Sequence, residues 1–322
     1  MTTRRSLPTQ PHPAPVGDAI GDIRATLATL TPAERVALFA TYTPDELLAL
    51  HFDWRVWARP SQLPPPGDWR VWLILSGRGW GKTRCGAEWI RSLAREHPGC
   101  RLAIVARTAA DVRDVCVEGE SGVLAVHPPS ERPLYEPSKR RITWRNSSQA
   151  TCYSADEPDL LRGPQHHAVW ADEVATWSDV DATWSNLQLG LRLGTSPRVL
   201  ATTTPRPIKL LRDLLASPST VVTRGSTFDN AANLAASALA EYRLRYEGTR
   251  LGRQELSGEL LWDTPGALWS RELLDRTRVQ AAPSDLERVV VGVDPATTSG
   301  PDADLTGIVT VAKGRESVRP PR

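Results

Sequence analysis

The sequence predicts an α/β fold built around a largely parallel β-sheet. Short, continuous apolar runs are typical of strands that are buried on both faces of such a sheet. Helix-like segments alternate with these runs, as the crossover connections between parallel strands require. The predicted strands are Val71–Leu75, Leu102–Ala106, His167–Ala171 and Val199–Thr203, and helix-like segments follow at 84–95, from Ala109 onward and at 239–261. A hairpin is also predicted over Ile142–Trp144 and Ala150–Ser154, around the polar turn at Asn146.

The N-terminal part is predicted to be a helical lead. Thr31 and Thr43 each precede a proline and have a glutamate three positions later, which is the pattern of a capped helix start. Apolar residues at helical spacing predict another helix over 18–30, and the polar, proline-rich residues 1–17 are expected to be disordered. The expected organisation is a lead at 1–44, a main α/β domain at 45–265, a linker at 266–285 and a further fragment at 286–322.

Composition excludes several classes of protein. The chain has 322 residues, enough for about two domains, and 24% charged with 40% hydrophobic residues excludes global disorder. The net charge of +2 means that any contact with nucleic acid has to come from a local basic patch. No apolar stretch approaches the roughly 18 residues of a membrane span, and the N-terminus lacks the apolar core of a secretory signal. The four cysteines lack metal-binding spacing and are expected to be buried free thiols in the cytoplasm, away from any membrane.

A glycine-rich loop follows the first predicted strand and opens the next helix. Its residues are Ser76, Gly77, Arg78, Gly79, Trp80, Gly81, Lys82 and Thr83, and they match the Walker A pattern except that Ser76 replaces the first glycine. The glycines allow backbone N–H groups to surround phosphate oxygens, and the helix N-terminus favours negative charge. Lys82 is expected to reach the β and γ phosphates of ATP, and Thr83 to bind Mg²⁺. The position between strand and helix favours a P-loop NTPase of the RecA/ASCE type over a glycine-rich turn without a ligand.

Two further motifs follow predicted strands. Asp172 and Glu173 end the strand His167–Ala171; Asp172 is expected to hold Mg²⁺ through water, and Glu173 to polarise the water that attacks the γ-phosphate. Such an Asp–Glu pair is typical of hydrolytic motors. Hydroxyls at the end of another strand are placed to sense loss of the γ-phosphate, although a threonine run can also reflect simple β-propensity. These hydroxyls belong to Thr202, Thr203 and Thr204.

The order of these motifs resembles that of the large terminase subunit of tailed bacteriophages, a motor that pumps DNA into capsids. It is most similar to the type found in gene transfer agents and prophages. The resemblance covers roughly residues 45–313 and rests on R-G-W-G-K-T at 78–83, L-R-G-P-Q at 161–165, W-A-D-E at 170–173, A-T-T-T-P-R-P at 201–207, and matches at 57–62, 224–230 and 246–256.

The resemblance implies roles for individual residues. Gln62 occupies the position of a glutamine that recognises adenine, with an ordinary loop glutamine as the alternative. Arg78 matches an arginine that contacts the γ-phosphate as a finger; the competing candidates are Arg162 and an arginine from a neighbouring subunit. Thr202–Thr204 match the motif that couples hydrolysis to DNA movement.

The resemblance also implies a C-terminal nuclease with an RNase H-like fold. Residues 288–293 fit its first strand, Asp294 fits the metal-binding aspartate at the end of that strand, and 306–311 fit the second strand of the hairpin. Two-metal cleavage needs more carboxylates, which the family places further along the chain. Residues 286–322 number only 37, below the roughly 40 that an unaided domain needs. We therefore expect an incomplete, nuclease-deficient fragment, from a truncated, frameshifted or split gene.

The predicted function is ATP-driven translocation of double-stranded DNA into a phage or phage-like capsid. The resemblance implies as partners duplex DNA, the portal protein and procapsid, the small terminase subunit, and further copies of the chain in a ring. DNA contacts are expected mainly to phosphates, because a packaging motor runs over any sequence. The alternatives are a RecA-type helicase or another DNA-dependent ATPase, and a degenerate subunit that occupies the packaging complex without catalysis.

Overall fold

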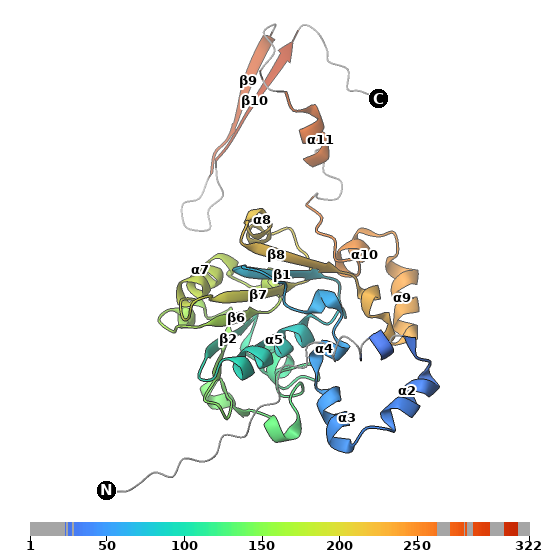
Figure 1. Cartoon of the computed structure of the whole chain (residues 1–322). Helices are drawn as coiled ribbons and strands as arrows, with labels where there is room; N and C mark the ends of the chain where they lie inside the picture. Colours follow the sequence, from blue (N-terminus) through green and yellow to red (C-terminus); the bar gives the residue numbers. More distant parts are fainter. Residues whose placement is uncertain are drawn as a thin grey trace, which may run out of the picture. The chain divides into compact units, whose positions relative to one another are not determined.

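The structure is a computed structural model that describes residues 23, 25–27, 29–262, 271–279, 281, 286–296 and 306–314. Contacts within the chain divide it into two units, Met1–Leu261 and Trp262–Arg322. The first unit contains a large sheet with helices packed on it, and the second contains a short helix and a hairpin (Figure 1).

The sheet of the first unit has the strand order β3-β4-β5-β2-β6-β7-β1-β8. Neighbours from β5 to β8 in this order pair in parallel, whereas β3 with β4 and β4 with β5 pair antiparallel. The predicted α/β class with a largely parallel sheet is confirmed, and so is the predicted hairpin, which forms β4 and β5. The strands are β1 (Val71–Ser76), β2 (Arg101–Ala106), β3 (Leu134–Glu136), β4 (Arg141–Thr143), β5 (Gln149–Ser154), β6 (Ala168–Ala171), β7 (Arg198–Thr203) and β8 (Thr220–Gly225).

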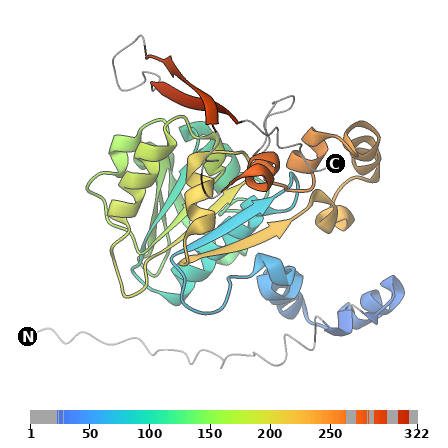
Figure 2. The same cartoon turned by 90° about the horizontal axis from the view of Figure 1, so that it is seen from above.

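Helices cover both faces of this sheet, so each central strand is buried on two sides (Figure 2). Alternate residues of β1 show the division: Trp72 and Ile74 pack with α5, whereas Leu73 and Leu75 pack with α7 and α8. Burial on both faces explains why the central strands are continuous apolar runs. The helices are α2 (Pro32–Phe39), α3 (Pro44–His51), α4 (Trp54–Trp57), α5 (Lys82–Glu96), α6 (Ala109–Asp111), α7 (Val180–Gly190), α8 (Lys209–Ala216), α9 (Ala236–Tyr246) and α10 (Arg250–Glu255).

The register of the central strands brings the sequence motifs to one edge. Ile74 and Leu75 of β1 lie opposite Thr202 and Thr203 of β7, and Ala171 of β6 lies opposite Ala201 of β7. Because the three strands are parallel, their carboxyl ends meet at the same edge of the sheet. The glycine-rich loop, the acid pair and the threonine run therefore all begin at that edge.

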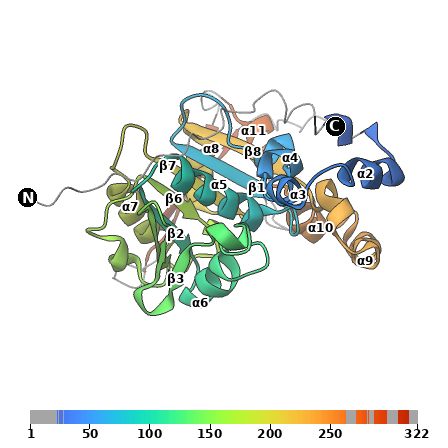
Figure 3. The same cartoon turned by 60° about the horizontal axis from the view of Figure 1, so that its bottom comes forward.

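The N-terminal helices start as the sequence predicts. Thr31 caps α2 and Thr43 caps α3, each by accepting a hydrogen bond from the backbone N–H of the glutamate three residues later. Each glutamate side chain in turn accepts from the N–H of the capping threonine, which satisfies two free donors at once. Figure 3 shows α3 and α4 beside α5. The predicted lead 1–17 and most of the predicted helix 18–30 lie outside the described residues.

The strand β3 and the helices α7 and α8 were not predicted, and two further features differ from the predictions. The half-buried strand β8 was not predicted, because Thr220, Thr223 and Arg224 interrupt its apolar pattern. The stretch 239–261, predicted as mostly helical, forms α9 and α10 with a break at Gly248, whose φ is +76°, and it is not helical after Leu256. Glu247 already leaves helical geometry with ψ 133°, and the Thr249 N–H donates to the Tyr246 carbonyl at 3.0 Å. The break is therefore a turn, in which glycine takes the left-handed position without strain.

The second unit holds α11 (Arg271–Thr277) and an antiparallel hairpin of β9 (Leu286–Asp294) and β10 (Gly307–Gly314). The two predicted strands are thus present, and Asp294 lies opposite Gly307. Both strands carry exposed apolar side chains, at Val289, Val290, Val291, Val293, Ile308, Val309 and Val311. The predicted linker 266–285 lies partly, and the tail 315–322 wholly, outside the described residues.

The four cysteines and the membrane prediction can be checked directly. Cys85, Cys100, Cys116 and Cys152 are all free and buried, as predicted. Across the described part of the chain, no helix combines the length and the apolar character that crossing a membrane requires.

Because the ring of His127 is buried, we expect the folded protein to lose stability in acid. Its Nδ1–H donates to the Val123 carbonyl at 2.7 Å, and its Nε2 accepts from Trp144 Nε1 at 2.9 Å, so the contact with Trp144 needs the neutral ring. Burial lowers the pKa of His127 from 6.5 to about 4. The unfolded chain therefore binds this proton more tightly, so stability is full above pH 6.5 and falls as the pH drops toward 4.

Urea unfolding at a series of pH values tests this. His127→Gln keeps a donor and an acceptor but does not titrate, so its stability should fall less than that of the wild type between pH 6.5 and 4. A residual fall is expected from His166, whose pKa burial also lowers to about 4. The exposed His97→Gln serves as control, and equal acid losses in His127→Gln and wild type would contradict the prediction.

Candidate functional site

The glycine-rich loop between β1 and α5 is shaped by glycines with left-handed backbone. Gly79 has φ +70° and Gly81, which caps α5, has φ +102°. Gly77 is needed for another reason: a Cβ there would lie 2.2 Å from the Leu256 carbonyl oxygen and 2.7 Å from Thr227 Oγ1. The loop is therefore curved by two glycines and enclosed by residues that lie far away in the sequence.

The carbonyl oxygens of this loop are held from outside. Thr227 Oγ1 donates to the Arg78 carbonyl at 2.7 Å, Asn230 Nδ2 donates to the Gly79 carbonyl at 2.7 Å, and Arg59 Nη2 donates to the Trp80 carbonyl. In a trans peptide, the C=O and the following N–H point in opposite directions. The N–H groups of residues 79–81 are therefore turned away from these partners.

Those three N–H groups, of Gly79, Trp80 and Gly81, donate no hydrogen bond within the described residues. Ser76 Oγ is likewise buried without a partner there. Successive free N–H groups before a helix N-terminus form a site for an anion. This arrangement fits the phosphates that the sequence predicts for the loop.

Lys82, the first residue of α5, is buried and held by several oxygens. Its Nζ lies 3.2 Å from Glu173 Oε1 and donates to Thr204 Oγ1 at 3.0 Å. The Ser76 and Gly77 carbonyls accept at 3.3 and 3.4 Å. Lys82 thus joins the loop, the acid pair and the threonine run in one cluster.

The two acidic residues after β6 have different surroundings. Asp172 is buried, and its Oδ1 accepts from Thr202 Oγ1 at 2.6 Å. Burial, and next the negative charge of Glu173, raise the pKa of Asp172. Glu173 is half-buried, and its Oε2 accepts from the Thr204 N–H at 3.0 Å. Its φ of +49° places it in the left-handed region, where a residue with a Cβ is strained.

The three threonines after β7 contact different parts of the acid pair. Thr202 Oγ1 bonds to Asp172 and accepts from the Glu173 N–H at 3.4 Å, and Thr203 Oγ1 accepts from the Ala175 N–H at 3.3 Å. Thr204 contacts the Glu173 carboxylate through its N–H and Lys82 through its hydroxyl. The run is therefore part of a hydrogen-bonded network and is not only a β-favouring sequence.

Gln62 and Trp80 lie behind the loop. Gln62 is buried, its Oε1 accepts from the Arg59 N–H at 3.0 Å, and its Nε2 donates to the Trp80 carbonyl at 3.5 Å. The Trp80 ring is buried, stacks under the Arg59 guanidinium at 4.9 Å and donates to Asp229 Oδ2 at 3.3 Å. Both side chains brace the loop from the side away from its free N–H groups.

The two arginines proposed as fingers lie apart. Arg78 Nε forms an ion pair with Glu255 Oε2 at 2.6 Å, and the Arg78 N–H donates to the Glu255 carbonyl. Arg162 is exposed and lies 3.4 Å from Asp159, and it does not line either of the cavities at the loop. Of these two arginines, it is Arg78 that shares a cavity with Lys82 and Glu173.

Two cavities meet at Lys82 and Glu173. One, of about 590 Å³, runs along the loop past Thr83 toward Asn230, and the other, of about 250 Å³, contains Asp172 and Thr204. The donors that the sequence assigns to Mg²⁺, the Thr83 hydroxyl and the Asp172 carboxylate, are the oxygen ligands that this ion prefers. These residues therefore fit Mg²⁺ in chemical type.

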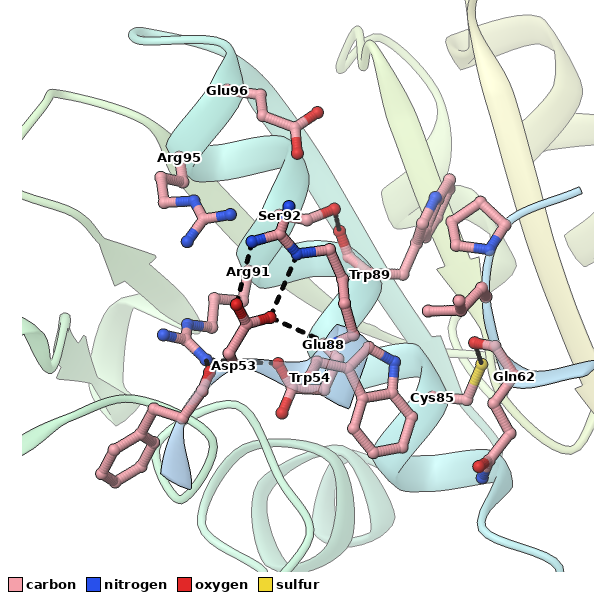
Figure 4. Close-up of a pocket in the computed structure, with 14 residues that line it drawn as sticks. Asp53, Trp54, Gln62, Cys85, Glu88, Trp89, Arg91, Ser92, Arg95 and Glu96 are labelled. Atoms are coloured by element: carbon pink, nitrogen blue, oxygen red, sulfur yellow. Dashed lines mark hydrogen bonds and ion pairs between the residues drawn. The ribbon is translucent and has the colours of Figure 1, made fainter. Parts of the chain in front are cut away.

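A third cavity lies on the other side of α5 and connects this helix to the N-terminal segment (Figure 4). At its centre the buried Glu88 forms ion pairs with Arg84 at 2.7 Å and Arg91 at 3.3 Å. Arg91 also donates to the Phe52 carbonyl, and Arg84 stacks on the Trp54 ring. The helix that carries Lys82 is thus fixed to the segment that supplies Gln62.

In the second unit, Asp294 ends β9 as predicted, opposite Gly307. Among the described residues of the chain, no group of three or more His, Cys, Asp or Glu side chains is gathered for a metal ion. Residues that sequence reasoning did not assign, Arg59, Thr227, Asn230 and Glu255, turn out to hold the loop and its arginine. All four had a faint signal, because they lie in the segments 57–62, 224–230 and 246–256, which already matched the family although these four residues had no assigned role.

The left-handed Glu173 predicts an unusual order of stabilities. Glu173→Ala and Glu173→Gly both remove the carboxylate, but only glycine removes the backbone strain. We expect Glu173→Gly to be more stable than Glu173→Ala by about 1 kcal/mol in urea unfolding. The same pair at Glu241, inside α9, should show the usual opposite order. Glu173→Ala being the more stable variant would contradict the backbone assignment.

The hydrogen bond from Thr227 Oγ1 to the Arg78 carbonyl anchors the loop, and two variants of Thr227 test its importance. Thr227→Val keeps the shape but leaves the Arg78 carbonyl without its partner, whereas Thr227→Ser keeps the hydroxyl. Because the anchor orients the loop N–H groups, we expect Thr227→Val to bind ATP and ADP about fivefold more weakly, for the loss of about 1 kcal/mol. Thr227→Ser should bind like the wild type in titration calorimetry. Unchanged binding by Thr227→Val would show that the loop does not need this anchor.

Comparison with known proteins agrees with this arrangement. The family model of terminase large subunits, T4-like virus type, N-terminal, matches residues 73–276. The large terminase of a thermophilic bacteriophage has a TM-score of 0.50 at 14% identity, over 76% of this chain and 60% of that chain. Its ADP complex gives the same TM-score and identity over 85% and 66%. The Thermus phage P74-26 large terminase ATPase domain gives 0.49 at 18% identity, over 63% and 94%.

These matches differ in what they establish. The likeness to the thermophilic bacteriophage terminase shows a shared fold, and this chain spans less than two thirds of that protein's length. No curated protein matches the sequence. The family model, in contrast, covers more than half of the chain. Together with the loop, the acid pair and the threonine network at one sheet edge, this match establishes that the chain belongs to the terminase large subunit family.

Proposed function

We propose that this chain is an ATP-hydrolysing motor subunit that drives double-stranded DNA into a phage or phage-like capsid. The observation that carries the proposal is the set of three unbonded N–H groups at 79–81 beside Lys82 and Glu173, within the part of the chain that the structure describes. A phosphate group satisfies such donors, and the adjacent carboxylate supplies a base for hydrolysis. Membership of the terminase large subunit family supports DNA as the cargo.

The phosphates of ATP enter the proposed site through Lys82. In the free protein Lys82 is paired with Glu173, and the γ-phosphate competes for the same ammonium group. When Lys82 turns to the phosphate, the Glu173 carboxylate loses its cation and becomes available as a base. Glu173 is still held by the Thr204 N–H, which keeps its orientation. Binding of the substrate thus prepares the catalytic carboxylate.

Hydrolysis follows as a direct displacement. A water oxygen attacks the γ-phosphorus, the bond from this phosphorus to the β–γ bridging oxygen breaks, and a water proton passes to Glu173. The loop N–H groups and Lys82 hold the phosphate oxygens on which charge gathers. Asp172 and Thr83 would hold Mg²⁺, which when bound neutralises phosphate charge.

Loss of the γ-phosphate is proposed to be read by Thr202–Thr204. When the phosphate leaves, Lys82 pairs again with Glu173 and Thr204. The change in the contacts of Thr204 is then transmitted to β7, which this residue follows. Arg78, once released from Glu255, is proposed as a contact of the γ-phosphate, and Gln62 as a contact of adenine. Each assignment extends a contact that these side chains already make near the loop.

The wider assembly is also a proposal. DNA would be gripped through its phosphates, the chain would act in a ring on a portal and procapsid in the host cytoplasm, and a small terminase subunit would bring the DNA. The exposed hairpin, whose first strand β9 ends in Asp294, is proposed to be part of a nuclease-like domain. In this proposal, the movement of DNA depends on the ATPase site described above.

Two variants test the ATPase site. Glu173→Gln keeps the shape but not the base, so it should bind ATP and lose hydrolysis by a factor of about 10² or more. Lys82→Ala should lose ATP binding as well. The exposed Lys139→Ala, whose partner is Glu136, is the matched control and should behave as wild type.

The readouts are ATP binding by calorimetry and phosphate release with and without duplex DNA. Wild-type protein that binds ATP but never hydrolyses it, with DNA present, would favour a degenerate subunit. Separation of a forked DNA by the wild type would favour a helicase.

A further inference from the structure

The positively charged side chains that line the smaller cavity at the loop differ in whether they are paired with a carboxylate. Four cationic side chains line it: Arg78, Lys82, Arg107 and Arg206. Three of them already have a carboxylate, because Arg78 pairs with Glu255, Lys82 with Glu173, and Arg107 with Asp111 at 3.1 Å. Within the described part of the chain, the exposed guanidinium of Arg206 forms no ion pair or hydrogen bond. Arg206 is therefore the cation of this cavity that is ready for an added anion.

The backbone of Arg206 is fixed close to the reacting groups. It follows Thr204, which contacts both Glu173 and Lys82, by two positions. Pro205 precedes it and Pro207 follows it, so its neighbours restrict the chain on both sides. The Ile208 N–H donates to the Arg206 carbonyl at 2.8 Å and closes the turn into α8. The side chain is exposed, and these neighbours restrict the backbone from which it extends.

We propose that Arg206 is a catalytic residue that contacts the terminal phosphate of ATP from within the same chain. The inference rests on the proposed ATPase function and adds a residue to it. A guanidinium presents several N–H donors to phosphate oxygens, and stabilises the charge that gathers there during transfer. Arg206 forms no covalent bond; the bond changes remain those of the water attack. Unlike Arg78 and Arg107, it reaches the phosphate without first breaking an ion pair.

The nucleotide supplies a sharp test, because ADP lacks the phosphate in question. Arg206→Ala should bind ADP within about twofold of wild type but a non-hydrolysable ATP analogue about tenfold more weakly. Its ATP hydrolysis should fall by about 10²–10³, the usual loss for one charge-stabilising donor. Arg206→Lys, which keeps the charge but not the planar fork, should recover part of both losses. The matched control is Arg192→Ala, at an exposed arginine outside this cavity.

Three results would overturn the inference. The first is hydrolysis by Arg206→Ala at the wild-type rate, and the second is an equal loss of ADP and analogue binding, which indicates only a structural role. The third is a loss of hydrolysis seen only when duplex DNA is present, which would place the guanidinium on a DNA phosphate. Wild-type protein that binds neither nucleotide would instead overturn the proposed function, and this inference with it.

Discussion

The conformation of the glycine-rich loop is fixed by hydrogen bonds to its carbonyl oxygens, and several elements of the first unit supply the donors. A short glycine-rich loop has many accessible conformations, and ordering it costs conformational entropy. Here that cost is met by donors from separate elements: Arg59 from the segment before β1, and Thr227 and Asn230 from the turn after β8. Three N–H groups are left without a partner in the described part of the chain, and an anion can satisfy such donors.

The acid pair beside the loop carries costs of its own. Asp172 is a buried carboxylate close to a second one, and Glu173 has a left-handed backbone. Both are unfavourable in isolation. They persist because Thr202 bonds to Asp172, Thr204 bonds to Glu173, and Lys82 neutralises part of the charge. The strain is thus located at the two carboxylates that we propose to act in hydrolysis, and the threonines after β7 stabilise them.

The cationic side chains around the site differ in whether they have an interaction partner within the described residues. Most arginines near the loop are committed: Arg59 to the loop carbonyl and Asn230, Arg78 to Glu255, and Arg84 and Arg91 to the buried Glu88. These pairs fix one element to another, and a planar guanidinium suits that task because it forms several bonds in a fixed geometry. The net charge of the chain does not show which arginines are paired, because pairing depends on the position of each individual partner.

Much could be predicted from the sequence, because local patterns carry local structure. Apolar runs identified the central strands, threonine–proline–glutamate patterns identified the starts of α2 and α3, and the loop, the acid pair and the threonines were recognised by residue type and spacing. Parallel strands must end at a common edge, so even the meeting of these motifs followed from the pattern. The edge strand β8 was missed because its half-buried surface mixes polar and apolar residues.

The partners of these motifs were decided only by the tertiary structure. Arg78 and Glu255, or Arg59 and Asn230, are more than 170 residues apart, and no local pattern relates them. Which arginine is paired and which is free depends on distances that arise when the elements pack. The sequence alone thus predicted a phosphate site and the residues that would form it. The fold decided how that site is held in place and left Arg206 without a partner in the described part of the chain, because pairing depends on distances in space and not along the chain.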